Sequence, residues 1–182
     1  MNVKHLKKEI IEIGKLLWDK DLASGLNGNI SLRVDSDRYL LTGRGTCLGR
    51  LDQDGIVFLG LDGKAFNKGH PSSEKLLHSE VYKNFPDTQA VIHTHLTFAN
   101  GYFHMNSTLA PSTFESRLYL GDIKCIEQST PTVTDIKPVM EALKKNNIVV
   151  LRNHGVLAMG KNLFDCFLLI QCLEESVKTD AI

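Results

Sequence analysis

The chain has 182 residues, of which 42% are hydrophobic and 23% are charged, and its 21 basic and 21 acidic residues cancel. This composition is typical of one globular domain with a sizeable core, and we expect that domain to span residues 1–182. Neither a basic stripe nor an apolar run of membrane-spanning length stands out, so neither nucleic acid nor a membrane is expected as a partner.

The first 20 residues predict an amphipathic helix, with Leu6, Ile10, Ile13 and Leu17 on one stripe. Charged residues interrupt this stretch too often for a secretory signal peptide, which favours a cytoplasmic location. The four cysteines form no C-x-x-C pair and are expected to be buried thiols in a reducing compartment. Any metal would then need histidine and carboxylate ligands.

Apolar segments separated by turn residues predict the remaining elements. Strands are expected within residues 30–34, 39–42, 55–64, 88–95 and 122–127, and as a pair within 147–160. Helices are expected within residues 70–85, 96–104, 135–146 and 162–179, the first of them capped by Ser72 or Ser73. Because several strands adjoin through short turns, we expect a single three-layer α/β domain with a central, mostly antiparallel mixed sheet flanked by helices.

Two histidines, His93 and His95, stand two residues apart in the apolar run VIHTHL. Residues i and i+2 of a strand project to the same side, so the pair fits either the polar face of a half-buried strand or half of a metal site. His154 follows a predicted strand in RNHG, where by itself it fits an ordinary turn histidine. Together, three imidazoles would leave open positions on a divalent metal, which is the catalytic arrangement.

The segment HPSSE, residues 70–74, also allows two interpretations. Glu74 suits the start of a helix electrostatically, or it serves as a general acid and base beside a metal. Ser72 and Ser73 either cap the helix or present hydroxyl and N–H groups to a phosphate. The turns GLNGNIS and TGRG can likewise offer N–H groups to an anion, although such turns are common.

In combination and in order, the short motifs of this chain resemble those of the class II aldolase/adducin family, and within it the L-fuculose-1-phosphate aldolases. The motifs are G-N-I-S, T-G, P-S-S-E, H-T-H and N-H-G. The resemblance runs from about Ser24 to Gly155. It implies that His93, His95 and His154 bind a divalent cation, usually Zn²⁺, with Mn²⁺, Co²⁺ or Mg²⁺ as alternatives. It also implies that Glu74 is the acid/base and can occupy a fourth metal position at rest.

The same resemblance implies a binding site for the phosphate of a small phosphorylated sugar. Its residues are Asn29, Thr42, Gly43, Ser72 and Ser73, with Arg44 close by. The implied reaction cleaves the C3–C4 bond of a ketose 1-phosphate, leaves an enediolate, and yields dihydroxyacetone phosphate and an aldehyde after Glu74 protonates the enediolate carbon. The implied assembly is a ring-like homotetramer.

Two features depart from the resembled aldolases. They supply a catalytic tyrosine from a neighbouring subunit, whereas no tyrosine aligns clearly here; the nearby candidates are Thr113, Phe114 and Tyr119. The chain also stops at Ile182, whereas many members carry a C-terminal tail over the site. Both departures concern the aldehyde half of the substrate.

Other activities on the same fold remain open. A pentulose-5-phosphate 4-epimerase breaks the same kind of bond, but the epimerases resemble P-S-S-D where Glu74 stands. A sugar-acid phosphate decarboxylase would use the same enediolate, whereas the methylthioribulose-phosphate dehydratases lack the glutamate. An adducin-like binding module would have lost the metal ligands, and a cupin-type H-x-H site is disfavoured by the interleaved helices.

Overall fold

The computed structural model describes residues 2–180; Met1 and residues 181–182 of the predicted domain lie outside the described residues. The strands are β1 (Asn29–Arg33), β2 (Arg38–Thr42), β3 (Ile56–Gly60), β4 (Ala90–Thr94), β5 (Thr108–Leu109), β6 (Ile123–Ile126), β7 (Ile148–Leu151) and β8 (Gly155–Gly160). Within residues 2–180 they form one eight-stranded sheet in the order β3-β2-β1-β4-β8-β7-β6-β5. Only the β6–β7 pair is parallel among these neighbours, so the predicted mostly antiparallel mixed sheet is confirmed.

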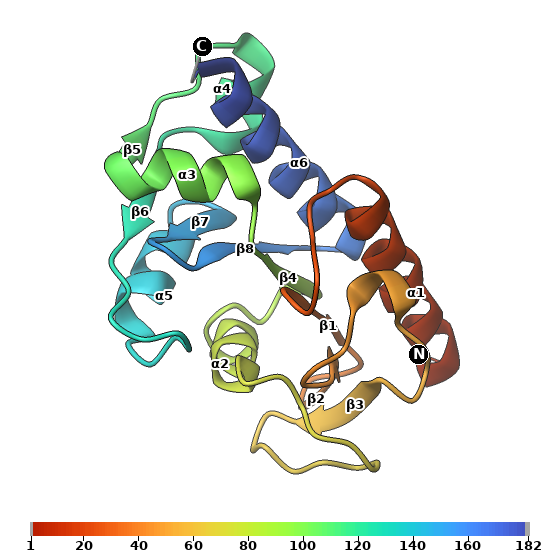
Figure 1. Ribbon diagram of the computed structural model, residues 1–182. Coiled ribbons are helices and arrows are strands. Elements are labelled where there is room, and N and C mark those ends of the chain that lie inside the picture. The colour runs from red at the N-terminus through yellow and green to blue at the C-terminus, as the bar shows by residue number, and fades with distance from the viewer. Residues whose placement is uncertain (1, 181–182) are drawn as a thin grey trace.

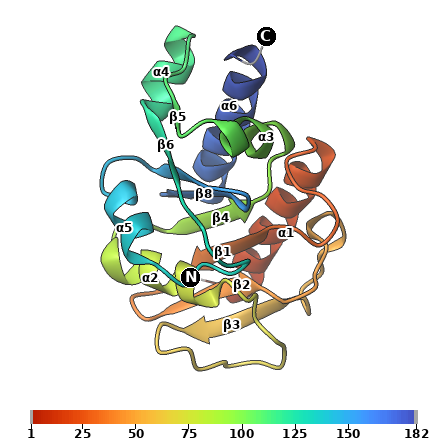
Figure 2. The same ribbon diagram turned by 60° about the vertical axis from the view of Figure 1, so that its left-hand side comes forward.

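Helices cover both faces of this sheet (Figure 1). They are α1 (Val3–Asp19), α2 (Lys75–Asn84), α3 (Thr97–Met105), α4 (Phe114–Leu120), α5 (Lys137–Leu143) and α6 (Leu163–Asp180). Helices α1, α3 and α4 contact α6, which packs on β4 and β8, whereas α2 contacts α5. Figure 2 shows α1 and α6 on one side of the sheet and α2 and α5 on the other, which is the predicted three-layer arrangement. None of the helices within residues 2–180 has both the length and the apolar character needed to span a bilayer.

The two core clusters follow from the alternation of side chains along the strands. On β4, Ala90 and Ile92 pack into the cluster beneath α1, α3 and α6, and Val91 packs into the cluster beneath α2 and α5. His93 continues the Val91 side of the strand. Apolar contacts on both faces of the sheet therefore hold β4 in place next to His93.

Two short elements, β5 and α4, were not predicted. The segment that holds them is rich in serine, threonine and proline, which are turn residues by local preference. Helix α4 is nevertheless stabilised at its start, because Thr113 Oγ1 accepts a hydrogen bond from Ser116 N at 3.2 Å. A short 3₁₀ turn at Leu48–Arg50 was also missed.

The predicted serine cap of α2 was wrong in its position. The N-cap residue is Glu74, and its side chain makes no capping hydrogen bond. Ser72 Oγ instead accepts a hydrogen bond from Glu74 N at 3.2 Å, so the serine stabilises the turn that precedes the helix. In this turn Ser73 is exposed to solvent, and Glu74 is the last residue before the helix.

Candidate metal and phosphate site

Three histidines converge where the end of β4 meets the start of β8, two neighbouring strands in the middle of the sheet. His93 lies in β4, His95 follows it directly, and His154 lies in the turn between β7 and β8. Antiparallel pairing of β4 with β8 brings the end of β4 next to the start of β8, with Thr94 opposite Val156. As a result, one ligand atom from each of the three imidazoles lies within 4.8 Å of the others.

A hydrogen bond to the backbone orients the ring of His93 toward the other two histidines. His93 Nδ1 lies 2.9 Å from the carbonyl oxygen of Val156, so it carries the proton and leaves Nε2 free to bind a metal. His93 Nε2 in turn lies 3.0 Å from His95 Nε2. His154 Nδ1 is buried and has no hydrogen-bond partner in the described part of the chain. An uncompensated buried nitrogen beside two converging imidazoles fits the donor set of a divalent cation.

The histidines are held in the neutral form that metal binding requires. Burial, with the neighbouring His154 and His95, lowers the pKa of His93 well below its ordinary value. Burial also lowers the pKa of His95, and it lowers the pKa of His154 to about 4. Neutral imidazoles keep their nitrogen lone pairs available at neutral pH.

Gly155 is the position at which β8 approaches the histidine pair. A Cβ atom built there would collide with the carbonyl oxygen of Thr94 and would lie 3.0 Å from His95 Cδ2 and 3.2 Å from His93 Cε1. Only glycine leaves the room that these two rings occupy. The glycine of the N-H-G motif is thus part of the geometry of the site.

Glu74 is buried, with 4% of its surface exposed, and lies at the start of α2. Its two carboxylate oxygens lie 3.4 and 3.3 Å from the backbone N of Val133, a residue of the loop between β6 and α5. Burial raises the pKa of Glu74, and the Val133 N–H only partly opposes this effect. Glu74 is not among the residues whose ligand atoms lie within 4.8 Å of one another, so its contact in this structure is with Val133.

The residues predicted to bind phosphate lie together where three segments meet. Thr42 Oγ1 accepts a hydrogen bond from Ile30 N at 3.1 Å, next to Asn29. The carbonyl oxygen of Thr42 accepts one from Ser72 N at 3.1 Å, and Gly43 pairs with Pro71. Segments 29–30, 42–43 and 71–73 are therefore neighbours in space.

The donors of this group differ in availability. Gly43 N donates to Gly55 O, and the Thr42 side chain is fully buried, so both are occupied in holding the segments together. Ser73 is exposed, and neither its hydroxyl nor Asn29 Nδ2 has a hydrogen-bond partner within residues 2–180. Asn29 and Ser73 are thus the members of this group best placed to donate to a ligand.

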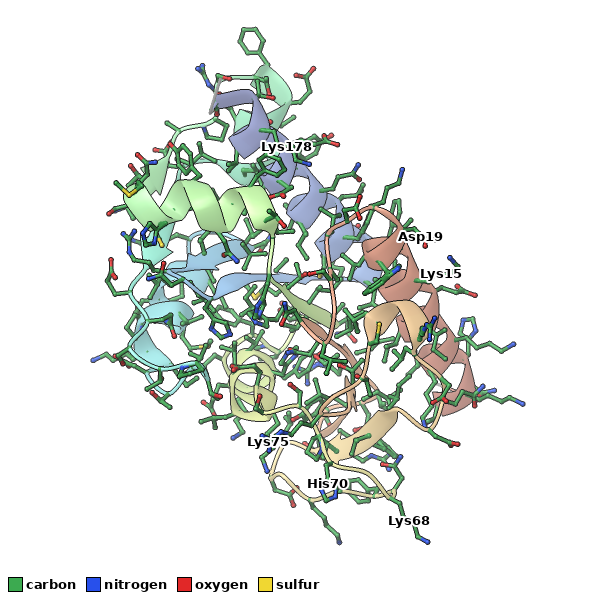
Figure 3. All side chains as sticks on the ribbon, viewed as in Figure 1. Lys15, Asp19, Lys68, His70, Lys75 and Lys178 are labelled. Carbon is green, nitrogen blue, oxygen red and sulfur yellow. The ribbon has the colours of Figure 1, made fainter. Side chains whose placement is uncertain are left out.

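Asn29 also links this region to the histidines, because it lies directly opposite His93 in the β1–β4 register. Opposite residues in an antiparallel pair present their side chains on the same face, about 5 Å apart. Basic side chains lie further out: Lys68, His70 and Lys75 point away from the protein along the segment that leads into α2 (Figure 3). Arg44 N donates to His70 O at 2.8 Å, which fixes the path of this outer rim.

The three candidates for the missing tyrosine lie on or beside α4. Thr113 is occupied as its capping residue, whereas Phe114 and Tyr119 are 87% and 63% exposed. A groove of about 940 Å³ between α4 and α6 contains Tyr119 but none of the residues predicted to bind metal or phosphate. Tyr119 therefore lines a groove that none of the three histidines lines, and the second acid/base group stays unassigned.

Sequence reasoning missed two polar contacts of the site. The N–H of Val133 has no signal in the sequence, because Val133 is an apolar loop residue 59 positions from Glu74. His78, which contacts Asn29, does have one: it lies four residues after Glu74, one helical turn further along α2.

Comparison with known proteins agrees with these observations. The family model described as "Class II Aldolase and Adducin N-terminal domain" matches residues 8–180. The L-fuculose phosphate aldolase of Methanocaldococcus jannaschii is 34% identical over 173 residues, covering 94% of this chain and 93% of that protein. The 3-oxo-tetronate 4-phosphate decarboxylase of Haemophilus influenzae is 27% identical over 178 residues, covering 94% and 85%. The crystal structure of L-fuculose-1-phosphate aldolase from Thermus thermophilus superimposes with a TM-score of 0.88 at 28% identity, covering 97% of this chain and 92% of that one.

Proposed function

Because the chain belongs to the class II aldolase and adducin family, we propose that it is a metal-dependent aldolase. In this proposal it cleaves a ketose 1-phosphate similar to L-fuculose 1-phosphate, reversibly, to dihydroxyacetone phosphate and an aldehyde. The observation that carries the proposal is the convergence of His93, His95 and His154 within 4.8 Å of one another, on the strand face that also presents Asn29.

The three histidines would hold the metal, and we propose Zn²⁺ because three neutral imidazoles suit it, with Mn²⁺, Co²⁺ or Mg²⁺ as alternatives. Such a cation supplies Lewis-acid chemistry, which stabilises the negative charge that develops on the substrate's carbonyl oxygen. The hydrogen bond from His93 Nδ1 to Val156 O orients this ligand before any substrate binds. We also keep Glu74 as a proposed fourth ligand in the resting enzyme.

Glu74 would hold the proton that is returned to carbon C3 of the cleaved fragment. Its raised pKa means that it keeps a proton to higher pH than an ordinary glutamate, which suits a general acid that must work near neutral pH. Burial excludes water from its carboxyl group, and the Val133 N–H holds that group in place.

The phosphate site would bind its ligand mainly through neutral donors, and its residues would be Asn29, Thr42, Gly43, Ser72 and Ser73. The position of Asn29 opposite His93 supports this assignment, since a ketose 1-phosphate carries its phosphate close to the carbonyl that faces the metal. Asn29 Nδ2 and the Ser73 hydroxyl would donate directly. Thr42 and Gly43 would maintain the spacing of the segments.

A sugar-acid phosphate decarboxylase is the second candidate, because three relatives of comparable coverage are named 3-oxo-tetronate 4-phosphate decarboxylase. Loss of carbon dioxide leaves the same kind of enediolate, so the same residues would serve. The distinction lies in the part of the substrate beyond C3, where the family tyrosine has no clear counterpart.

One substrate panel tests both candidates. Metal-loaded protein is incubated with ketose 1-phosphates and assayed for dihydroxyacetone phosphate, with 3-oxo acid phosphates and assayed for carbon dioxide, and with ribulose 5-phosphate and assayed for epimerisation. Release of dihydroxyacetone phosphate from a ketose 1-phosphate supports the aldolase, whereas carbon dioxide release from an acid phosphate without cleavage of any ketose 1-phosphate would replace it with the decarboxylase. Absence of both bound metal and turnover would favour an adducin-like binding module.

We further propose that the active assembly is a homotetramer. Helix α4 exposes three large apolar side chains, Phe114, Leu118 and Tyr119, of which the last two line the 940 Å³ groove. Exposed apolar patches are commonly contact surfaces. Light scattering coupled to gel filtration should give four times the mass of the chain. A monomer would contradict this proposal.

A further inference from the structure

A chain of four buried polar side chains connects β1 with α2. His78 Nε2 lies 2.5 Å from Asn29 Oδ1, and His78 Nδ1 lies 2.7 Å from Ser31 Oγ. Ser31 Oγ lies 2.8 Å from the hydroxyl of Tyr82. His78 and Ser31 are fully buried, and Asn29 alone reaches the surface, with 7% exposed. The proposed reaction gives no role to His78, Ser31 or Tyr82.

The spacing of these residues makes the chain possible. Asn29 and Ser31 are two apart on a strand and project to the same face, and His78 and Tyr82 are four apart on a helix and lie on one side of it. Tyr82 is itself fixed, because Arg33 stacks 4.6 Å above its ring and donates to its carbonyl oxygen at 2.7 Å. The chain is therefore rigid at its inner end.

Hydrogen-bond chemistry allows two directions along the chain, which differ at the surface. Burial lowers the pKa of His78 to about 3, so the ring is neutral and carries a single N–H. If Nε2 carries the proton, it donates to Asn29 Oδ1 and Nδ1 accepts from the Ser31 hydroxyl. That hydroxyl in turn accepts from Tyr82, so every partner is satisfied.

The opposite arrangement has a different consequence at the surface. With the proton on Nδ1, His78 would donate to Ser31, and the Asn29 amide would have to turn so that its NH₂ group donates to Nε2. The carbonyl oxygen of Asn29 would then face the site. An oxygen acceptor there repels an anion, whereas an NH₂ group binds it.

We infer that His78 is a positioning residue, which holds the Asn29 side chain through its Oδ1 so that Nδ2 points at the phosphate group of the substrate. The inference rests on the proposed sugar-phosphate activity, and it assigns the orientation of the phosphate donor to a helix residue that does not touch the ligand. Helix α2 also begins at Lys75, two residues after Ser73, so the His78–Asn29 contact holds both halves of the phosphate site at a fixed separation.

Two neutral variants separate the two ends of the imidazole. In His78→Gln the longer side chain can place an amide N–H near the position of Nε2, so contact with Asn29 is kept. In His78→Asn the shorter side chain reaches only toward Ser31, so that contact is lost. Each variant is made in the wild-type and in the Asn29→Ala background. The dissociation constant for dihydroxyacetone phosphate is measured by calorimetry on the metal-loaded protein.

We expect His78→Asn to weaken binding of dihydroxyacetone phosphate by about 10-fold or more. Without the contact to His78, Asn29 Nδ2 is no longer held toward the phosphate, and its hydrogen bond to that charged group is lost. His78→Gln should stay within about 3-fold of wild type, because its contact with Asn29 is kept. In the Asn29→Ala background the two variants should bind equally, because the residue through which His78 acts is gone. Metal content should remain unchanged in all of them.

Several results would overturn the inference. One is weakening by the same factor in both backgrounds, which would mean that His78 acts by packing alone; another is equal binding by all variants. Imidazole ¹⁵N shifts test it without any substitution, since the protonated nitrogen of His78 must be Nε2 and finding Nδ1 protonated would refute it. If wild-type protein does not bind dihydroxyacetone phosphate, the proposed function fails first and this inference fails with it.

Discussion

His93 Nε2 and His95 Nε2 face each other at a distance of 3.0 Å, and His154 completes the triangle with ring centroids 4.7 and 5.0 Å from the other two. Three neutral imidazoles in contact have little reason to converge without a shared partner, because each buries a nitrogen lone pair. A divalent cation is such a partner. The relationship between these side chains therefore leads to the first prediction.

Replacing His95 with alanine should remove the metal and nearly all activity, because two imidazoles do not hold a divalent ion as three do. Elemental analysis of the purified variant measures the loss directly. His5→Ala, on the exposed face of α1, is the matched control and should keep the metal. A full equivalent of metal in the His95 variant would show that the ligands were assigned wrongly.

Gly155→Ala should weaken metal binding without removing any ligand. The added methyl group would collide with the Thr94 carbonyl oxygen and crowd both His93 and His95, so β8 or the rings must shift. We expect a metal dissociation constant at least about 10-fold higher, since loss of the oriented geometry around ligands typically costs about 10–100-fold in affinity. Gly101→Ala is the control, because a Cβ there would meet open space. Equal metal affinity in both variants would show that the site tolerates the shift.

Ser73→Ala should raise the KM for phosphorylated substrates while kcat changes little, because the hydroxyl contributes to binding rather than to proton transfer. The expected effect is about 10- to 150-fold, the range for one hydrogen bond to a charged group. Ser36→Ala, at an exposed turn beyond the other end of β1, should leave KM unchanged. Equal cleavage of an unphosphorylated ketose by the wild type would argue against a phosphate site altogether.

Glu74→Gln separates binding from chemistry. The three histidines remain, so the metal should largely stay bound, whereas kcat should fall by about 10²- to 10⁴-fold, as expected for loss of a general acid and base. Exchange of the C3 proton of dihydroxyacetone phosphate with deuterated water should slow by a comparable factor, since exchange needs the base but no aldehyde. Glu80→Gln, on the surface of the same helix, is the control. Exchange at the wild-type rate would reduce Glu74 to a helix-start carboxylate.

His78 should make the stability of the protein depend on pH. Its pKa is about 3 in the folded protein and 6.5 ordinarily, so between these values the unfolded chain binds a proton that the native protein does not. The free energy of unfolding therefore rises with pH across this window, and the contribution of His78 is lost as the pH falls from 6.5 toward 3. His78→Gln should flatten that slope by up to about 1.4 kcal/mol per pH unit.

Urea titrations between about pH 4.5 and 7, inside and just above this window, measure the slope for wild type and variant at equal metal content. His5→Gln, exposed on α1, is the matched control. Identical slopes for wild type and His78→Gln would mean that residue 78 is protonated equally in both states, and hence that the ring is not buried as the structure has it.

The sequence by itself was enough for the family, the mixed sheet and the identity of the metal-binding candidates. Apolar alternation in AVIHT specifies which face each residue of β4 presents, and it places His93 and His95 on one side because side chains repeat every two residues. The order of the short motifs predicted the family and its remaining site residues, since each motif depends on only a few neighbouring residues. Local signals of this kind survive without knowledge of the tertiary structure.

Contacts between distant residues were decided only by the tertiary structure. Three such contacts join residues that are 49 to 63 positions apart in the sequence. They are the Val133 N–H at the Glu74 carboxyl group, the Val156 carbonyl that selects Nε2 of His93, and the His78 ring that orients Asn29. Such contacts depend on strand register and helix packing, and periodicity reports only which face a residue occupies, not what lies opposite it. For this reason the sequence predicted the candidate ligands and the candidate acid/base, whereas their orientation, burial and pKa came from the fold.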